Sequence, residues 1–145
     1  MVKAWKIIVA AIAFMIIAQI VNTLEAYATM SYYLDSAYFA VWSKIMMPTA
    51  GPPPMEFYYY SIAFSFISGL LFAGVYTIFI KNVPGKTIAK KGLMYGLLIW
   101  LVGGVSGYLS LILLINLSID LIAYWALAGL IVNLLAGIAT AEIVK

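Results

Sequence analysis

Three polar side chains recur at helical spacing in the first long apolar stretch of the chain. Gln19, Asn22 and Glu25 stand three residues apart, so they follow one slowly turning face of a helix. Amide and carboxylate groups inside a long apolar helix are costly, and they mark either hydrogen bonds between helices or a path for a substrate or proton. Later apolar stretches carry further polar residues at matching depths. The candidate intramembrane polar site consists of Gln19, Asn22, Glu25, Ser68, Ser106 and Asn133.

Two interpretations of this site stay open. As hydrogen bonding between helices, each contact would stabilise a bundle by about 0.6 kcal/mol on average. As a carrier path, the site would open outward past Glu25, which lies about 27 Å along the helix from Ile7 at 1.5 Å per residue. The acids Asp35, Glu56 and Asp120 fall at expected helix N-termini, where negative charge is favourable. Glu25 is therefore the least explained acid on its side.

The residue types that the chain lacks exclude several kinds of chemistry. The sequence contains no Cys, no His and no Arg. Without Cys there are no disulfides and no thiolate ligands, and without His the commonest general base and metal ligand is missing. We therefore expect no metal, no cofactor and no catalytic residues. A membrane-embedded enzyme ranks third among the functions considered, because no pair of nucleophile and base is apparent.

The composition indicates a membrane protein. Of the 145 residues, 66% are hydrophobic and 9% are charged. A soluble domain contains about 25% charged residues, and a soluble fold of this length could not bury so much apolar surface. Much of that surface must face lipid. We expect residues 1–145 to form a single transmembrane domain in the cell membrane.

Four apolar segments are long enough to cross a bilayer, which takes about 20 residues in a helix. They run over about residues 5–28, 56–80, 92–117 and 121–144. The predicted fold is therefore an all-α membrane protein, a bundle of four transmembrane helices with a short interfacial helix in its first outer loop.

That outer loop spans residues 29–55. Asp35 is a suitable N-cap for a helix over about 36–47, and Pro48 would end this helix. Tyr38, Trp42 and their apolar neighbours share one side of the helical projection, which is typical of a helix lying flat in the membrane interface.

Aromatic residues crowd the same boundary of the predicted bundle. The pattern is typical of an aromatic belt among lipid headgroups. The alternative is a stacking pocket for a lipid, a quinone or a cationic ligand. The residues concerned are Tyr27, Tyr32, Tyr33, Tyr38, Phe39, Trp42, Phe57, Tyr58, Tyr59, Tyr60, Tyr124 and Trp125.

The lysines predict the orientation. Seven of the eight fall on one side if four helices alternate, and Lys44 alone falls on the other. The positive-inside rule then places both termini and the 81–91 loop in the cytoplasm. Because the net charge of +3 is divided between two membrane faces in this way, we expect no nucleic acid partner.

Small residues repeat at helical spacing in three of the four segments. Such stripes let helix backbones approach closely in lipid, where no hydrophobic force drives helices together. They indicate either packing within one bundle or a face for a second copy or a partner membrane subunit. The expected packing positions are Gly69, Gly96, Gly104, Gly107, Gly129 and Gly137.

The layout resembles that of small prokaryotic four-helix membrane proteins without an assigned activity. The resemblance lies in the long aromatic first outer loop and in the stretch Lys91-Gly92-Leu93-Met94-Tyr95-Gly96 at the start of the third helix. It implies no activity. Small multidrug exporters also have four helices and a glutamate in the first, but theirs lies deep in the membrane, whereas Glu25 lies near the outer boundary.

We therefore expect an oligomeric or accessory subunit of a membrane complex, with the lipid bilayer as its surroundings. The alternative is a small carrier or channel that uses Gln19, Asn22 and Glu25. A cavity reaching Glu25 from outside would favour the carrier, and a dry core with an exposed small-residue stripe would favour the subunit.

Overall fold

The computed structural model describes residues 2–145 and contains four long apolar helices. The first is α1 (Ala4–Ala28), and the second is α3 (Met55–Phe79). The third is continuous from Ile88 to Leu114, although its geometry changes midway, and the fourth is α6 (Ile119–Val144). Each is long and apolar enough to cross a membrane. The prediction of an all-α bundle with four candidate transmembrane helices is confirmed.

The third helix consists of α4 (Ile88–Ile99), the π-helix η2 (Trp100–Val105) and α5 (Ser106–Leu114). It begins four residues earlier than expected because the Thr87 side chain accepts a hydrogen bond from the Lys90 amide at 3.2 Å and caps it. The π turn holds more residues per turn than an α-helix, so it rotates the faces of α4 and α5 relative to each other.

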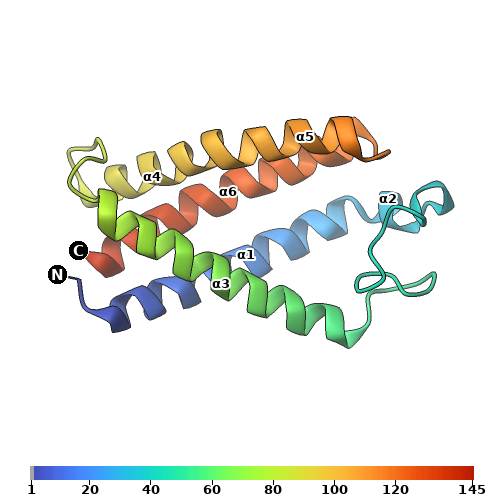
Figure 1. Ribbon diagram of the computed structural model, residues 1–145, viewed down its shortest axis with the longest axis horizontal. Coiled ribbons are helices and arrows are strands. Elements are labelled where there is room, and N and C mark those ends of the chain that lie inside the picture. The colour runs from blue at the N-terminus through green and yellow to red at the C-terminus, as the bar shows by residue number, and fades with distance from the viewer. Residues whose placement is uncertain (1) are drawn as a thin grey trace.

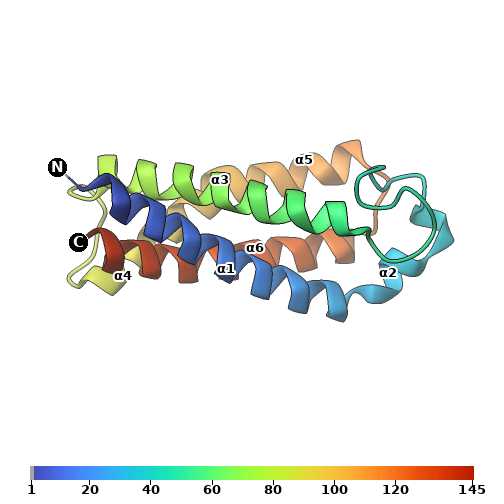
Figure 2. The same ribbon diagram turned by 90° about the horizontal axis from the view of Figure 1, so that it is seen from below.

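The helices pack in the spatial order α3, α1, α6, α4 (Figure 1). The extensive contacts join α3 to α1, α1 to α6, and α6 to α4. Both termini and the link between α3 and α4 lie at one end, which we call the terminal end, and α2 (Met30–Leu34) lies at the opposite, loop end (Figures 1 and 2). From the terminal end to the loop end, α3 diverges from α4 and α5 (Figure 1).

The buried core lies toward the terminal end. Phe72 and Tyr76 of α3 meet Tyr95 of α4, with ring centroids 4.7 and 5.0 Å from that of Tyr95. The Tyr95 hydroxyl donates a hydrogen bond to the Phe72 carbonyl at 2.6 Å. These three residues, which we call the aromatic gate, join α3 to α4 where their backbones make no extensive contact. Small residues around them, such as Ala73 and Ala136, are fully buried.

Glycines bring α4 and α6 into backbone contact. A Cβ on Gly96 would lie 2.0 Å from the Asn133 carbonyl oxygen, and one on Gly137 would lie 2.2 Å from that of Gly92. Gly69 approaches α1 in the same way, with Ala11 O only 2.7 Å from an added Cβ. These positions leave no room for any other residue.

The other expected packing glycines lie elsewhere. At Gly129 an added Cβ would meet the Tyr108 hydroxyl, and at Gly104 it would meet only the ring of Trp100. At Gly107 no atom lies within 4 Å of an added Cβ. A straight helix would place Gly104 in one register with Gly96. The π turn between them rotates the stripe away from α6.

The segment between α1 and α3 differs from the expected interfacial helix over 36–47. It forms α2, the 3-10 turn η1 (Ser36–Tyr38) and then hydrogen-bonded turns. Asp35 accepts from the Ala37 amide as an N-cap, and the Ser43 hydroxyl accepts from the Met46 amide. The Ser43 bond, inside the expected helix, competes with its continuous backbone pattern. The Trp42 ring packs 5.1 Å from that of Tyr33, which folds the segment back over the bundle.

Candidate functional site

A cavity of about 640 Å³, which we call the lateral cavity, lies between α1, α3, α5 and α6 at the loop end. It exists because α3 diverges from α5 and because small side chains line the gap, among them Ala18, Ser65 and Gly129. It reaches the middle of the helices, where the buried core closes it. Its polar lining residues are Asn22, Glu25, Ser43, Tyr60, Ser61, Ser65, Ser68, Tyr108, Trp125 and Asn133.

A second cavity of about 520 Å³, the loop cavity, lies beneath α2 and residues 46–53. It is bounded by α1 and α3 and shares four wall residues with the lateral cavity: Asn22, Glu25, Phe57 and Ser61. Glu25 therefore stands at the junction of a cavity between helices and a cavity under the loop.

The Glu25 carboxylate accepts a hydrogen bond from the Thr29 hydroxyl at 2.7 Å. Thr29 is fully buried, and its hydroxyl also lies 2.9 Å from the Glu25 carbonyl oxygen one turn earlier. Within residues 2–145, the ion pair is that of Lys145 with Glu142, so Lys44 does not neutralise Glu25. The half-buried carboxylate thus keeps a free oxygen toward the cavities.

Gln19 serves helix packing. Its amide donates to the Ser61 hydroxyl at 3.0 Å and to the Ser65 hydroxyl at 3.1 Å, which ties α1 to α3. It lines the loop cavity but not the lateral cavity. Hydrogen bonding between helices therefore accounts for Gln19, whereas it does not account for Asn22 and Glu25.

The remaining candidates divide between the cavity and the surface. Asn22, Glu25, Ser68 and Asn133 line the lateral cavity together. The Asn133 amide donates to the Gly129 carbonyl at 2.8 Å, within its own helix. Ser106 is exposed and lines neither cavity, because the π turn directs this part of the helix elsewhere.

The candidate site did not include Thr29, which bonds to Glu25, or wall residues such as Ser61, Ser65 and Tyr108. The spacing of four between Glu25 and Thr29 is a signal that sequence reasoning could have used, since such pairs meet on a helix. Tyr108 carried no comparable signal. Its hydroxyl meets Gly129 of α6 only because of how α5 and α6 pack.

A cluster of aromatic side chains fixes the loop end of α6 to α2. The Trp125 indole donates to the Tyr33 hydroxyl at 2.9 Å, and Trp42 packs against both residues. Burial raises the pKa of Tyr33 above that of an ordinary phenol, against a smaller lowering effect of this hydrogen bond. Tyr33 therefore stays protonated and neutral beside the site.

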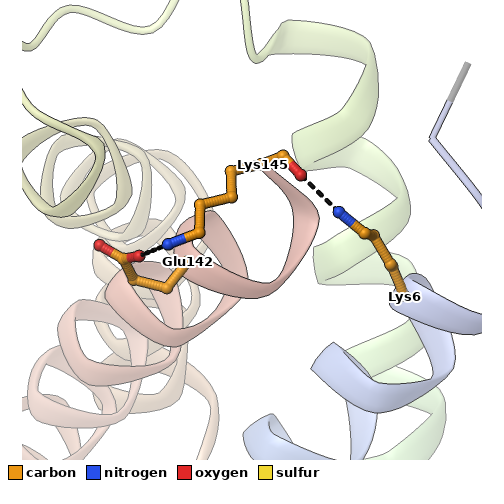
Figure 3. Close-up of polar contacts among 3 residues, drawn as sticks. All are labelled: Lys6, Glu142 and Lys145. Carbon is orange, nitrogen blue, oxygen red and sulfur yellow. Dashed lines mark hydrogen bonds and ion pairs between the residues drawn. The ribbon is translucent and has the colours of Figure 1, made fainter.

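Polar contacts lie at the terminal end (Figure 3). The Lys6 ammonium of α1 donates to the Lys145 carbonyl, which joins the start of α1 to the end of α6. Lys145 also forms an ion pair with Glu142, one turn earlier, at 2.5 Å.

The walls of the two cavities contain few charged side chains. Among the described residues, Glu25 is the one carboxylate in either wall, and no lysine lines them. No group of three or more His, Cys, Asp or Glu side chains that could hold a metal ion lies within residues 2–145. The walls can therefore offer hydroxyls, amides, aromatic rings and one negative charge. Comparison of the chain with known protein families, curated proteins and solved structures gives no match.

Proposed function

We propose that this protein is a small membrane carrier whose binding site is the lateral cavity. The observation that supports the proposal is a cavity with polar groups in its wall that reaches Glu25 at one end of the bundle, while the buried core lies toward the other end. Its volume of about 640 Å³ falls in the range of small-molecule sites, about 300–1,000 Å³. A helix bundle that served only as a scaffold would gain by filling such a space.

The packing order suggests how the access could alternate. The pair α1–α3 meets the other two helices mainly through the contact of α1 with α6. At the terminal end, α3 is held to α4 by the aromatic gate, with one hydrogen bond from Tyr95 to Phe72. A rocking motion of α3 would open this gate and close the gap against α5, as in transporters that rock one helix bundle against another.

The lysine distribution gives the proposed carrier a direction. With the lysine-rich terminal end in the cytoplasm, the lateral cavity faces the outside of the cell. The conformation in the structure is then the outward-open one.

Cysteine labelling tests the proposal, because the chain has no cysteine of its own. Ser68→Cys would place a thiol in the lateral cavity, and Ala73→Cys would place one in the closed core. A carrier predicts that a membrane-impermeant thiol reagent labels the first from outside and the second, more slowly, from the cytoplasmic side. Val102→Cys, on a side chain that is 75% exposed midway along the third helix and outside both cavities, is the control that should react from neither side.

A scaffold predicts a different pattern. Ala73→Cys would then stay unreactive from both sides in folded protein, and this result would overturn the carrier. The oligomeric or accessory subunit stays a prediction that cross-linking in native membranes can test.

A further inference from the structure

The walls of the lateral cavity combine one negative charge with several aromatic rings. Glu25 is its carboxylate, and Phe57, Tyr60, Tyr108 and Trp125 are its ring-bearing neighbours toward the loop end. A cation gains from both a carboxylate and ring faces, because the face of an aromatic ring carries partial negative charge. We infer that the ligand is a hydrophobic organic cation and that Glu25 is its counter-ion. This inference rests on the proposed carrier function.

The position of the cavity explains why the cation should be hydrophobic. It lies between α3 and α5, which make no extensive contact with each other, and Ser43 and Ile45 line it at the loop side. Besides its side toward the loop end, the cavity therefore also opens between α3 and α5 toward the hydrocarbon region of the membrane. A small hydrated ion would have to lose its water on this path, whereas an apolar body bearing a delocalised charge or an ammonium group would not.

The loop cavity gives the same carboxylate a second approach. It reaches Glu25 from beneath residues 46–53, on the aqueous side of the bundle. A proton can thus reach Glu25 by the loop cavity while the cation occupies the lateral cavity. Protonation makes the carboxylate neutral and removes the attraction for the cation, so binding should weaken at low pH.

The pH dependence of cation binding should come from Glu25 and not from its neighbours. The titratable side chains that line its two cavities from α1, α3 and α5 are Tyr27, Tyr58, Tyr60 and Tyr108, and Tyr33 faces it from α2. Tyrosines are neutral at acid and neutral pH. Neither α6 nor residues 43–53 place a charged side chain in these walls.

A pair of probes of matched size and opposite charge tests the inference. Tetraphenylphosphonium and tetraphenylborate would be titrated into the purified protein in dodecyl maltoside micelles. We expect the cation to bind at least about tenfold more tightly than the anion, which corresponds to about 1.4 kcal/mol. We also expect Glu25→Gln to weaken cation binding about tenfold and to abolish its pH dependence. Equal binding of the two probes by the unmodified protein would overturn the inference.

Glu56→Gln is the matched control, because Glu56 is an exposed acid at the start of α3 that lines neither cavity. It should leave the affinity unchanged. An equal loss in both variants would mean that overall charge, and not the site, attracts the cation, and would also contradict the inference. Neither result would alter the cysteine-labelling pattern, so the carrier proposal is tested separately.

Repeating the titration with phosphatidylethanolamine added to the micelles distinguishes two sources of the cation. Weaker apparent binding would identify a lipid amine as the natural occupant, and unchanged binding would identify a free organic cation.

Discussion

The Gly96 Cα of α4 rests against the backbone of Asn133 in α6, so closely that a Cβ would lie 2.0 Å from the Asn133 carbonyl oxygen. The side chain of the same Asn133 lines the lateral cavity. One residue of α6 therefore provides both a close helix contact and part of the candidate binding site. The close packing of α4 on α6 therefore helps to set the position of one wall of the cavity.

Gly96→Ala should destabilise the bundle by about 1–3 kcal/mol, because the added methyl group has no space beside Asn133. Gly103→Ala is the control in the same helix, where nothing lies within 4 Å of an added Cβ. It should be neutral or slightly stabilising, since alanine is the better helix former. Thermal unfolding in detergent measures both. Equal Tm values for the two variants would contradict the packing described for α4 and α6.

Tyr95→Phe should loosen the aromatic gate. The change removes the hydrogen bond to the Phe72 carbonyl, worth about 1 kcal/mol, and keeps the ring. A shift of that size changes the population of a minor open state about fivefold. The rate of labelling of Ala73→Cys from the terminal end should rise by that factor in the double variant. An unchanged rate would show that the gate does not control access.

Thr140→Val should stabilise the conformation in the structure. Thr140 is 1% exposed, and its hydroxyl has no hydrogen-bond partner among residues 2–145. Replacing a buried unpaired hydroxyl with a methyl group of the same shape should raise the free energy of unfolding by about 1 kcal/mol. Thr77→Val is the matched control. The Thr77 hydroxyl donates to the Gly74 carbonyl at 2.7 Å, so its loss should not stabilise. A lower Tm for Thr140→Val would show that the hydroxyl is used.

The orientation makes its own prediction. A cysteine at Lys86, in the link between α3 and α4, should react with a membrane-impermeant reagent only after the cytoplasmic face is opened. A cysteine at Thr49, in the exposed loop between α1 and α3, should react in intact cells. The reverse pattern would place the lateral cavity on the cytoplasmic side.

The long helices were predictable because they depend on local properties. The apolar runs of α1, α3 and α6 predicted their bounds to within two residues. The helix expected over 36–47 was wrong because the Ser43 hydroxyl bonds locally to the Met46 amide, and because Trp42 packs against Tyr33, a contact between distant turns of the segment. The π turn could not be predicted from the sequence either. The π turn begins at Trp100, whose indole donates a hydrogen bond to the Ala126 carbonyl of α6 at 3.0 Å, a tertiary contact.

The candidate site, too, could be predicted from the sequence only in part. Matching depths along antiparallel helices grouped Gln19, Ser68, Ser106 and Asn133, and of these Ser68 and Asn133 line one cavity in the structure, together with Asn22 and Glu25. The exposure of Ser106 followed from a rotation of the helix that no periodicity revealed. The cavity itself arises from the divergence of α3 and α5, and that angle depends on the packing of every helix at once.

Pulsed electron paramagnetic resonance distances between α3 and the third helix test the carrier most directly. One pair of spin labels would replace Ile62 and Leu109 at the loop end, and another would replace Ile78 and Leu93 at the terminal end, all exposed positions. A carrier predicts two distances for each pair of labels. As pH or the tetraphenylphosphonium concentration is varied, the distance at one end should become longer when the distance at the other end becomes shorter. A single unchanging distance for each pair under all these conditions would contradict alternating access and leave the bundle a static scaffold.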